Sequence, residues 1–439
     1  MKLRFTLIPI LLCCGPLWGQ GKEHWVATWT TSQPMARSLH VRGGGPPAGG
    51  RSTPAAPPAA AAPAQSAAAG RQGFAAQQAI AAQGFDNQTV RMIVRTSIGG
   101  GRVRIRLSNA FDSQPVAVGA AHIAIRGKES EIVSGSDRTL TFSGKPGCTV
   151  GPGMVLLSDP VDLAIPKLGD IAVSLYFPGP TGPPTSHGGL RTSYLSKEGD
   201  FSGQASIPDA TTTGMYYWLC GIDVLAPPEV ALVVALGDSI TESFRSTPDT
   251  NRSWPSVLSA RLGANKGTAN VAVGNMGMGG NRVLRDNTGA SMLARFDHDV
   301  LSQPGVKWVI VLEGINDIGR VGTIPAEAPT AEDLIGGYKQ LIERAHTFGL
   351  KAIGGTLPPY GGANSYRESG EAVREAVNNW IRTSGAYDAV IDFEAATRDT
   401  GDPKRLRAEF DPGDHLHLSD AGYQAMADAV DLKLFSGKR

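Results

Sequence analysis

From residue 229 onward, short apolar runs alternate with helical segments, and this alternation is the feature that most restricts the fold. One helical segment begins after Thr330, with Asp333 three residues on as a capping partner, and stops near Gly349. Strands that alternate with helices form a parallel sheet with helices on both faces, so an α/β domain is expected. The expected strands are 231–237, 270–273, 306–313, 351–357 and 389–393.

The region before this domain shows a period of two. In the run RVRIRLSN, Val103, Ile105 and Leu107 alternate with arginines, and the run DIAVSLYF at 170–177 alternates in the same way. Short strands separated by Gly, Pro and Asp are typical of a β-sandwich or jelly roll. We therefore expect an all-β, jelly-roll-like domain over 21–228, followed by the α/β domain over 229–439.

The N-terminus has the pattern of a secretory signal peptide over residues 1–20. Lys2 and Arg4 precede an apolar run that is too short to span a membrane, and glycines follow it as cleavage sites. The chain is therefore expected to be secreted or periplasmic, without a membrane span. A lipoprotein anchor at Cys13 or Cys14 is the alternative, although the preceding leucines fit it poorly.

Two further features concern order and redox state. Residues 43–83 are rich in Pro, Ala, Gly and Gln and bury little apolar surface, which predicts a low-complexity insert within the β-domain. After signal cleavage only Cys148 and Cys220 remain, and the sequence leaves open whether they form a disulfide or stay as two buried thiols.

The charge composition bears on the class of partner. The chain has 41 basic and 40 acidic side chains, a net charge of +1, and no Lys/Arg-rich tract. Steering toward nucleic acid or an anionic membrane therefore has no support. A small molecule or a polysaccharide ester is the expected partner, and the oligomeric state cannot be read from the sequence.

Candidate functional residues follow three of the expected strands. Ser239 ends the run ALVVALGDS, Gly280 lies in GNMGMGGNRV after the second strand, and Asn316 lies in LEGINDIG after the third. Because ligands of parallel sheets gather at the carboxyl ends of the strands, these residues are expected to converge. Alone, each motif is equally consistent with a capped helix or a tight turn.

A fourth cluster, DPGDHLHLSDAGY, precedes the last helix. Asp414 and His417 are three residues apart, so one turn can bring the carboxylate to one ring nitrogen while the other faces Ser239. A serine is inert at neutral pH unless an oriented base takes its proton. His415 competes for this role but lacks the three-residue spacing from Asp414, and His346 is expected at the surface of a helix.

Together the four clusters resemble, in order and placement, the SGNH branch of the GDSL hydrolases. The resemblance covers about residues 230–436 and implies a flavodoxin-like three-layer fold. It implies Ser239 as nucleophile and His417 as base, oriented by Asp414. It further implies an oxyanion hole made by the N–H groups of Ser239 and Gly280 and the side chain of Asn316, and no metal or organic cofactor.

The β-rich region is similar to that of secreted two-domain SGNH proteins, which implies a jelly-roll-like module that could hold a glycan; His187 could face the cleft. The expected activity is removal of acetyl or other short acyl groups from carbohydrate, with Trp254, Tyr360 and Tyr366 as candidates for stacking on sugars. The alternatives are a lipase or arylesterase for small apolar esters, and a glycan-binding protein with a vestigial catalytic site.

Overall fold

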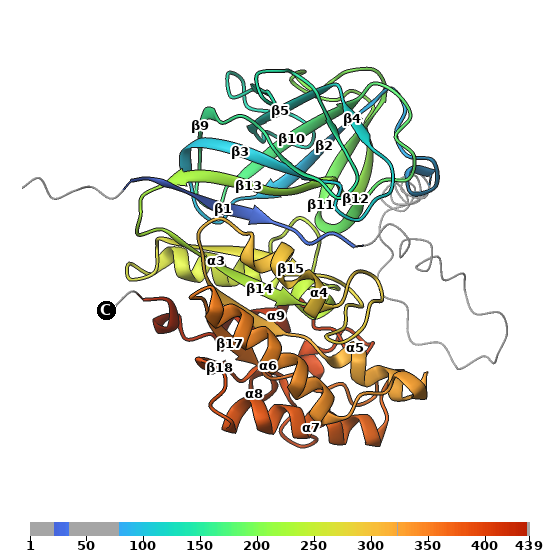
Figure 1. Cartoon of the computed structure of the whole chain (residues 1–439), viewed down its shortest axis with the longest axis vertical. Coiled ribbons are helices and arrows are strands. Elements are labelled where there is room, and N and C mark those ends of the chain that lie inside the picture. The colour runs from blue at the N-terminus through green and yellow to red at the C-terminus, as the bar shows by residue number, and fades with distance from the viewer. Residues whose placement is uncertain (1–21, 35–78, 323, 437–439) are drawn as a thin grey trace, which may run out of the picture.

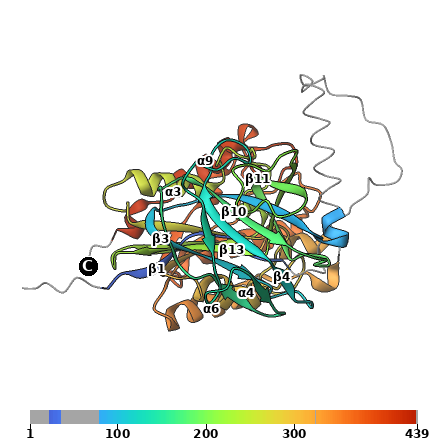
Figure 2. The same cartoon turned by 90° about the horizontal axis from the view of Figure 1, so that it is seen from above.

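The computed structural model describes residues 22–34, 79–322 and 324–436. Figure 1 shows two parts stacked along the long axis: antiparallel strands above, and a sheet flanked by helices below. Figure 2, seen from above, shows the antiparallel strands overlying the helical part. The predicted order, an antiparallel β region followed by an α/β region, is confirmed.

The α/β part is built on a five-stranded parallel sheet in the order β15-β14-β16-β17-β18. In chain order this is 2-1-3-4-5, the flavodoxin-like arrangement. Every residue of the central strand β14 is buried, which explains its uninterrupted apolar sequence. The strands are β14 Ala231–Gly237, β15 Val271–Gly277, β16 Val306–Leu312, β17 Lys351–Gly355 and β18 Ala389–Ile391.

The helices begin and end where local chemistry predicts. Thr330 and Asp333 form a reciprocal capping box at the start of α6, and Gly349 follows its end with a φ of 71°. Helix α3 packs on β15 and α9, whereas α6 packs on β17 and α7. The helices are α2 Ser239–Glu242, α3 Trp254–Ala264, α4 Met292–Phe296, α5 Ile315–Ile318, α6 Ala331–Thr347, α7 Glu368–Thr383, α8 Phe393–Thr397 and α9 Asp420–Asp428.

The first part contains two larger antiparallel sheets and one short ribbon. One sheet has the order β1-β13-β3-β8, with β9 also on β3, and the other the order β12-β11-β2-β10-β5-β6. The strands are β1 His24–Thr30, β2 Gln88–Arg95, β3 Gly100–Ser108, β4 Val116–Val118, β5 Ala120–Ile125, β6 Arg138–Leu140, β7 Cys148–Val150, β8 Val155–Leu157, β9 Val161–Ile165, β10 Asp170–Phe177, β11 Ser186–Glu198, β12 Thr211–Tyr217 and β13 Leu219–Ala226.

The expected alternation along β3 holds for the apolar residues but not for all the arginines. Val103, Ile105 and Leu107 are fully buried. Arg106 is also buried, because its Nε lies 3.0 Å from Oδ1 of the buried Asp223 on β13. A buried charge needs such a partner, and two adjacent strands supply it here.

Strand β1 lies between the two parts and packs against both (Figure 1). It pairs with β13, while the Ala27 N–H donates to the carbonyl of Pro304 at 3.0 Å. The approach is close: a Cβ added to Gly274 would lie 2.7 Å from Thr30 Oγ1. One added to Gly305, which has a φ of 79°, would lie 2.9 Å from the side chain of Val26. The small size of both glycines therefore lets β1 pack onto the α/β part.

Several sequence expectations fall at the edge of the described residues. The predicted signal peptide and most of the predicted 43–83 insert lie outside them. The end of that insert was placed too late: residues 79–83 are helical and Ile80 is buried in the core, because this apolar side chain finds a packing surface. Cys148 and Cys220 are free thiols, and burial raises the pKa of each to about 11.

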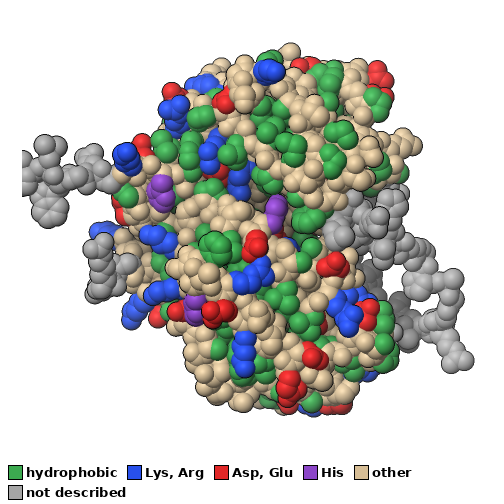
Figure 3. All heavy atoms as spheres, viewed as in Figure 1, with side chains coloured by type: hydrophobic (Ala, Val, Ile, Leu, Met, Phe, Trp, Pro, Cys, Tyr) green, Lys and Arg blue, Asp and Glu red, His purple; other side chains and the backbone are tan. Residues whose placement is uncertain are grey.

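The surface mixes charges of both signs. On the face drawn in Figure 3, Lys and Arg side chains are interspersed with Asp and Glu rather than gathered into one patch. Within the described ranges, no helix has the length and apolar character needed to cross a bilayer.

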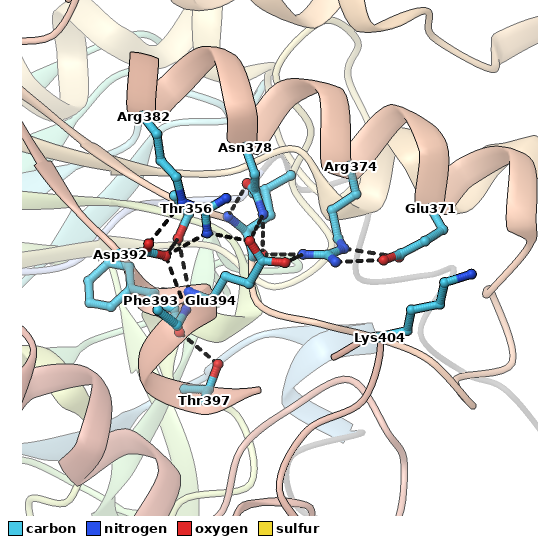
Figure 4. Close-up of polar contacts among 12 residues, drawn as sticks. Thr356, Glu371, Arg374, Asn378, Arg382, Asp392, Phe393, Glu394, Thr397 and Lys404 are labelled. Carbon is cyan, nitrogen blue, oxygen red and sulfur yellow. Dashed lines mark hydrogen bonds and ion pairs between the residues drawn. The ribbon is translucent and has the colours of Figure 1, made fainter. Parts of the chain in front are cut away.

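A buried ionic cluster joins α7, α8 and the segment after β17 (Figure 4). The Arg374 guanidinium lies 2.6 Å from Glu371 and 2.8 Å from Glu394, and it donates to the Leu357 carbonyl at 2.9 Å. Asn378 bonds both the carbonyl and the N–H of Leu357. The cluster therefore holds the chain leaving β17 against helix α7.

Arg374→Ala is expected to lower the free energy of unfolding by about 3–5 kcal/mol, because it leaves buried Glu371 without its cation and Glu394 with Arg382 alone. The matched control is Lys404→Ala, which removes the exposed ion pair between Lys404 and Glu368 and should cost less than about 1 kcal/mol. Urea denaturation measures both variants. Equal, small losses would show that the buried cluster does not stabilise the fold.

Candidate active site

The candidate site lies at the carboxyl edge of the parallel sheet. Gly237 at the end of β14 pairs with Gly277 at the end of β15 and with Leu312 at the end of β16, so the three strands end side by side. Ser239, Gly280 and Asn316 follow these strands after two, three and four residues. The register of the sheet therefore brings the three sequence-predicted positions to one edge, at the point where the strand order reverses.

Ser239 begins the short helix α2 directly after β14. Asp238 caps this helix, because its Oδ1 accepts a hydrogen bond from the Ile240 N–H at 2.8 Å. The Ser239 N–H belongs to the first turn and so has no partner within the helix. Ser239 is only 9% exposed. The Ser239 hydroxyl therefore lies just after the buried strand and is largely shielded from solvent.

Three side chains form a continuous hydrogen-bonded chain. His417 Nε2 lies 2.9 Å from Ser239 Oγ, and His417 Nδ1 lies 2.9 Å from Asp414 Oδ2. The other oxygen of Asp414 accepts the backbone N–H of His417 at 2.9 Å and that of Leu416 at 3.2 Å. The turn between Asp414 and His417 thus fixes both the carboxylate and the imidazole.

The pKa values of Asp414 and His417 are both lowered, which favours the ionised carboxylate and the neutral imidazole. Burial would raise the pKa of Asp414, but the hydrogen bonds from the His417 backbone and ring and the charge of that ring lower it well below its usual range. Burial lowers the pKa of His417, and the hydrogen bond and charge of Asp414 only partly offset this. At neutral pH the carboxylate is ionised and the imidazole can accept a proton.

The other two histidines considered, His415 and His346, bond to carboxylates outside the Ser239 chain. His415 Nδ1 pairs with Asp411 Oδ2, and its backbone has a φ of 59°. His346 Nε2 pairs with Asp388 at 2.8 Å and is partly exposed. Neither contact includes Ser239. The geometry therefore favours His417, the histidine that the three-residue spacing from Asp414 also favours.

Gly280 and Asn316 carry donors without protein acceptors. Gly280 has a φ of 74°, and an added Cβ would lie 2.7 Å from Thr288 Oγ1. Among the described residues, its N–H and the buried Nδ2 of Asn316 have no hydrogen-bond acceptor. Asp317 accepts the N–H groups of two residues in the segment after Gly280, Val283 and Leu284. It therefore ties this segment to α5.

Beneath these residues, one buried arginine joins the strand ends. Arg295 donates to the carbonyls of Gly237 on β14 and Met276 on β15 at 2.8 and 2.9 Å. Its Nε donates to Asn281 Oδ1 at 2.8 Å, and Asp299 balances its charge at 2.6 Å. Sequence reasoning missed Arg295, because nothing in its helical segment distinguishes it from a surface arginine.

Two buried carboxyl groups lie beside this arginine. Burial raises the pKa of Glu313 well above its usual range, and the neighbouring charge of Asp238 adds to the effect. Burial also raises the pKa of Asp238 to about 7. The charge of Asp238 further favours the protonated form of Glu313, and neither carboxyl oxygen of Glu313 has a hydrogen-bond partner among the described residues. Glu313 belongs to the LEGINDIG motif, but the neighbouring residues in the sequence do not predict a buried carboxyl group with a raised pKa.

Two further residues flank the histidine. The Phe244 ring, 45% exposed, lies edge-on to the His417 ring at 4.9 Å between centroids. Arg245 Nε lies 3.1 Å from Asp414 Oδ2, the same oxygen that bonds the histidine. Both follow α2 in the sequence ITESFRS, where only their position after the Gly-Asp-Ser motif could have drawn attention to them.

The Asp238 pKa predicts a pH dependence of stability. An unfolded aspartate ionises near pH 4, whereas folded Asp238 does so near 7. Between these values the folded state binds a proton that the unfolded state lacks, so this contribution to stability is lost as pH rises from 4 to 7. Urea denaturation should show the wild type losing stability relative to Asp238→Asn over this range. Glu313→Gln removes another buried carboxyl group with a raised pKa, so it should also lose less stability than the wild type over this range. Parallel curves for wild type and Asp238→Asn would contradict the assignment.

Comparison with known proteins agrees with the motifs. Residues 235–425 match the model of the GDSL-like Lipase/Acylhydrolase family. No curated protein gives a significant match. Similar solved structures include a G-D-S-L family protein from Desulfitobacterium hafniense DCB-2, with 23% identity, a TM-score of 0.35, and coverage of 45% of this chain and 97% of that one. Another is Axe2, an acetylxylan esterase from Geobacillus stearothermophilus, with 22% identity, a TM-score of 0.36, and coverage of 48% and 95%. Residues 235–425 therefore form a domain that matches the GDSL-like lipase/acylhydrolase family.

Proposed function

We propose that this acylhydrolase is a secreted serine esterase that removes acetyl or other short acyl groups from carbohydrate through an acyl-serine intermediate. Ser239 is the nucleophile, His417 the general base and Asp414 its orienting partner. The observation that carries the proposal is the hydrogen-bonded chain of these three side chains, with 2.9 Å at each side-chain contact.

The distances support a two-step reaction. Ser239 Oγ attacks the ester carbonyl while its proton passes to His417 Nε2. The imidazolium, held by ionised Asp414, then protonates the departing alcohol oxygen as the carbon–oxygen bond breaks. In the second step His417 takes a proton from water, the hydroxide displaces Ser239 from the acyl group, and the serine regains its proton.

The negative charge that forms on the carbonyl oxygen needs donors. The N–H groups of Ser239 and Gly280 and the Nδ2 of Asn316 are the proposed donors, since all three belong to segments leaving adjacent strand ends. The lack of a protein acceptor for the buried Asn316 amide supports this role, because a buried donor is normally paired.

The surroundings favour a short acyl group. Each methylene of a longer chain would need an apolar wall to contribute about 0.8 kcal/mol. Phe244 is an exposed apolar side chain beside His417, whereas Phe348 and Val390, also exposed, belong to the end of α6 and to β18. A lipase or arylesterase for small apolar esters is the remaining alternative.

Two expected sugar contacts are wrong. Trp254 and Tyr360 are fully buried, and Trp254 packs against Phe393 with 5.4 Å between ring centroids. Both are core residues, because their rings find apolar neighbours beneath the loops. Tyr366 is partly exposed and remains a candidate.

The intact constellation argues against a vestigial site in a glycan-binding protein, since such a protein would have no need to retain Ser239, His417 and Asn316.

Secretion rests on the signal-peptide pattern of residues 1–20 and is part of the proposal. Sequencing the N-terminus of the exported protein would test it.

A hydrolysis panel tests the function. We expect kcat/KM to fall steadily from acetyl to octanoyl aryl esters, and acetate to be released from an acetylated polysaccharide. Ser239→Ala is the control and should lose about 10⁶-fold in kcat with the fold intact. A preference rising toward octanoyl, with no acetate from any glycan, would favour the lipase alternative. A Ser239→Ala enzyme with a tenth of the wild-type rate would exclude this nucleophile.

Asn316→Ala should lower kcat about 10²- to 10³-fold with little change in KM, because it removes one donor to the oxyanion. Asn379→Ala changes an exposed asparagine of α7 and serves as the matched control, with kcat unchanged. Steady-state kinetics on an aryl acetate measures both. A wild-type kcat in Asn316→Ala would remove this residue from the oxyanion hole.

A further inference from the structure

A polar cavity of about 120 Å³ lies where the β-sandwich part meets the α/β part. Its walls come from β1 and β11 on one side and from α2, α3 and β15 on the other. Figure 1 shows β1 at the junction of the two parts. A water needs roughly 10–15 Å³ of such space, so on the order of ten water-sized positions are available. That is room for one small ring-shaped molecule rather than for a polymer segment.

The cavity is lined by polar atoms whose hydrogen bonding is incomplete. Ser259 and Arg191 both line it and both are more than nine-tenths buried. Among the described residues, neither Ser259 Oγ nor Arg191 Nε has a hydrogen-bond partner. The rest of the Arg191 guanidinium is occupied, for instance by Asn251 Oδ1 at 2.9 Å. Buried donors of this kind require hydroxyl groups of a ligand or water.

Two aromatic side chains add an apolar wall. Trp29 of β1 and Tyr216 of β12 both line the cavity and pack edge to face with 5.0 Å between ring centroids. Hydroxyl-binding groups beside aromatic surface suit a molecule with both O–H and C–H faces, such as a sugar ring.

The charges of the lining are balanced within the protein. Arg95 and Arg191 both pair with Asp170, from β10. Glu242 Oε1 lies 3.4 Å from His187 Nε2, across the junction of the two parts. Because the cations already have carboxylate partners, the cavity favours a neutral ligand over an anionic one.

The cavity also adjoins the candidate active site. Glu242 ends helix α2, one turn after Ser239, and Gly277 ends β15; both line the cavity. A ligand held there would lie beside the helix that begins with the nucleophile. Neither Ser239 nor His417 lines the cavity, so a ligand there would hold a part of the alcohol remote from the ester bond rather than the acyl group.

We propose that this interdomain cavity is a subsite for a neutral sugar residue in the alcohol part of the substrate, held jointly by the two parts of the chain. The proposal rests on the proposed esterase function, but its binding step can be measured without catalysis.

Isothermal titration of the Ser239→Ala chain with the methyl β-glycosides of glucose, galactose, mannose and xylose tests the subsite. At least one glycoside should bind. Adding Ser259→Ala should weaken that binding about 2- to 12-fold, the effect of one hydrogen bond, without lowering Tm, because this hydroxyl has no protein partner. Ser259→Leu, which fills the cavity, should abolish binding. Ser193→Ala, another buried serine with an unpaired hydroxyl that does not line the cavity, should bind as the Ser239→Ala chain does.

The outcomes separate the two proposals. Hydrolysis of 4-nitrophenyl acetate by the wild type measures the esterase function separately, since this ester has no sugar. If the wild type does not hydrolyse that ester, the esterase function fails whatever binds. The subsite proposal is overturned if no glycoside binds, if Ser259→Leu binds as tightly as the parent, or if glucuronate binds as tightly as the neutral sugars.

Discussion

The buried Arg295 guanidinium is the contact on which the candidate site depends. It donates to the last part of β14 and β15 and to the Asn281 side chain, so it holds two strand ends and the segment that includes Gly280 in one arrangement. Parallel strands alone would bring these ends to one edge, and Arg295 adds a second donor to the Gly237 carbonyl, which also accepts the Met278 N–H at 2.9 Å. Asp299 keeps the arginine charged at low cost, and the neutral Glu313 avoids adding a second uncompensated charge. The carboxyl edge of the sheet, where the candidate site lies, is therefore held by a buried cluster whose charges are compensated.

The rim of the candidate site is more exposed to solvent than this buried cluster. Ser239 and His417 are largely buried, whereas Phe244 and Arg245 reach solvent. Arg245 shares one carboxylate oxygen of Asp414 with the histidine, so the orienting carboxylate has partners both inside and outside the site. Such an arrangement holds Ser239, His417 and Asp414 in fixed positions beside a solvent-exposed rim, as the proposed proton transfer requires.

The sequence predicts what depends on local pattern and chain order. The all-apolar run of β14, the Thr330 cap and the Asp414–His417 spacing each have a short-range cause, and each appears in the structure. Arg106, Arg295 and Glu313 could not be assigned, because a charged residue is buried only when a distant segment supplies its partner. Ile80 and Trp254 were misjudged for the same reason: whether a side chain lies in a core depends on what covers it.

The course of β1 has a consequence for how the chain can be divided. By sequence order, residues 24–30 belong to the β part, yet they also form a wall of the α/β part through Val26, Ala27 and Thr30. A fragment beginning at residue 229 would carry all three side chains of the proposed triad but would expose the surfaces around Gly274 and Gly305 that this strand covers. A division of the chain at residue 229 would therefore separate two parts that share one packed surface.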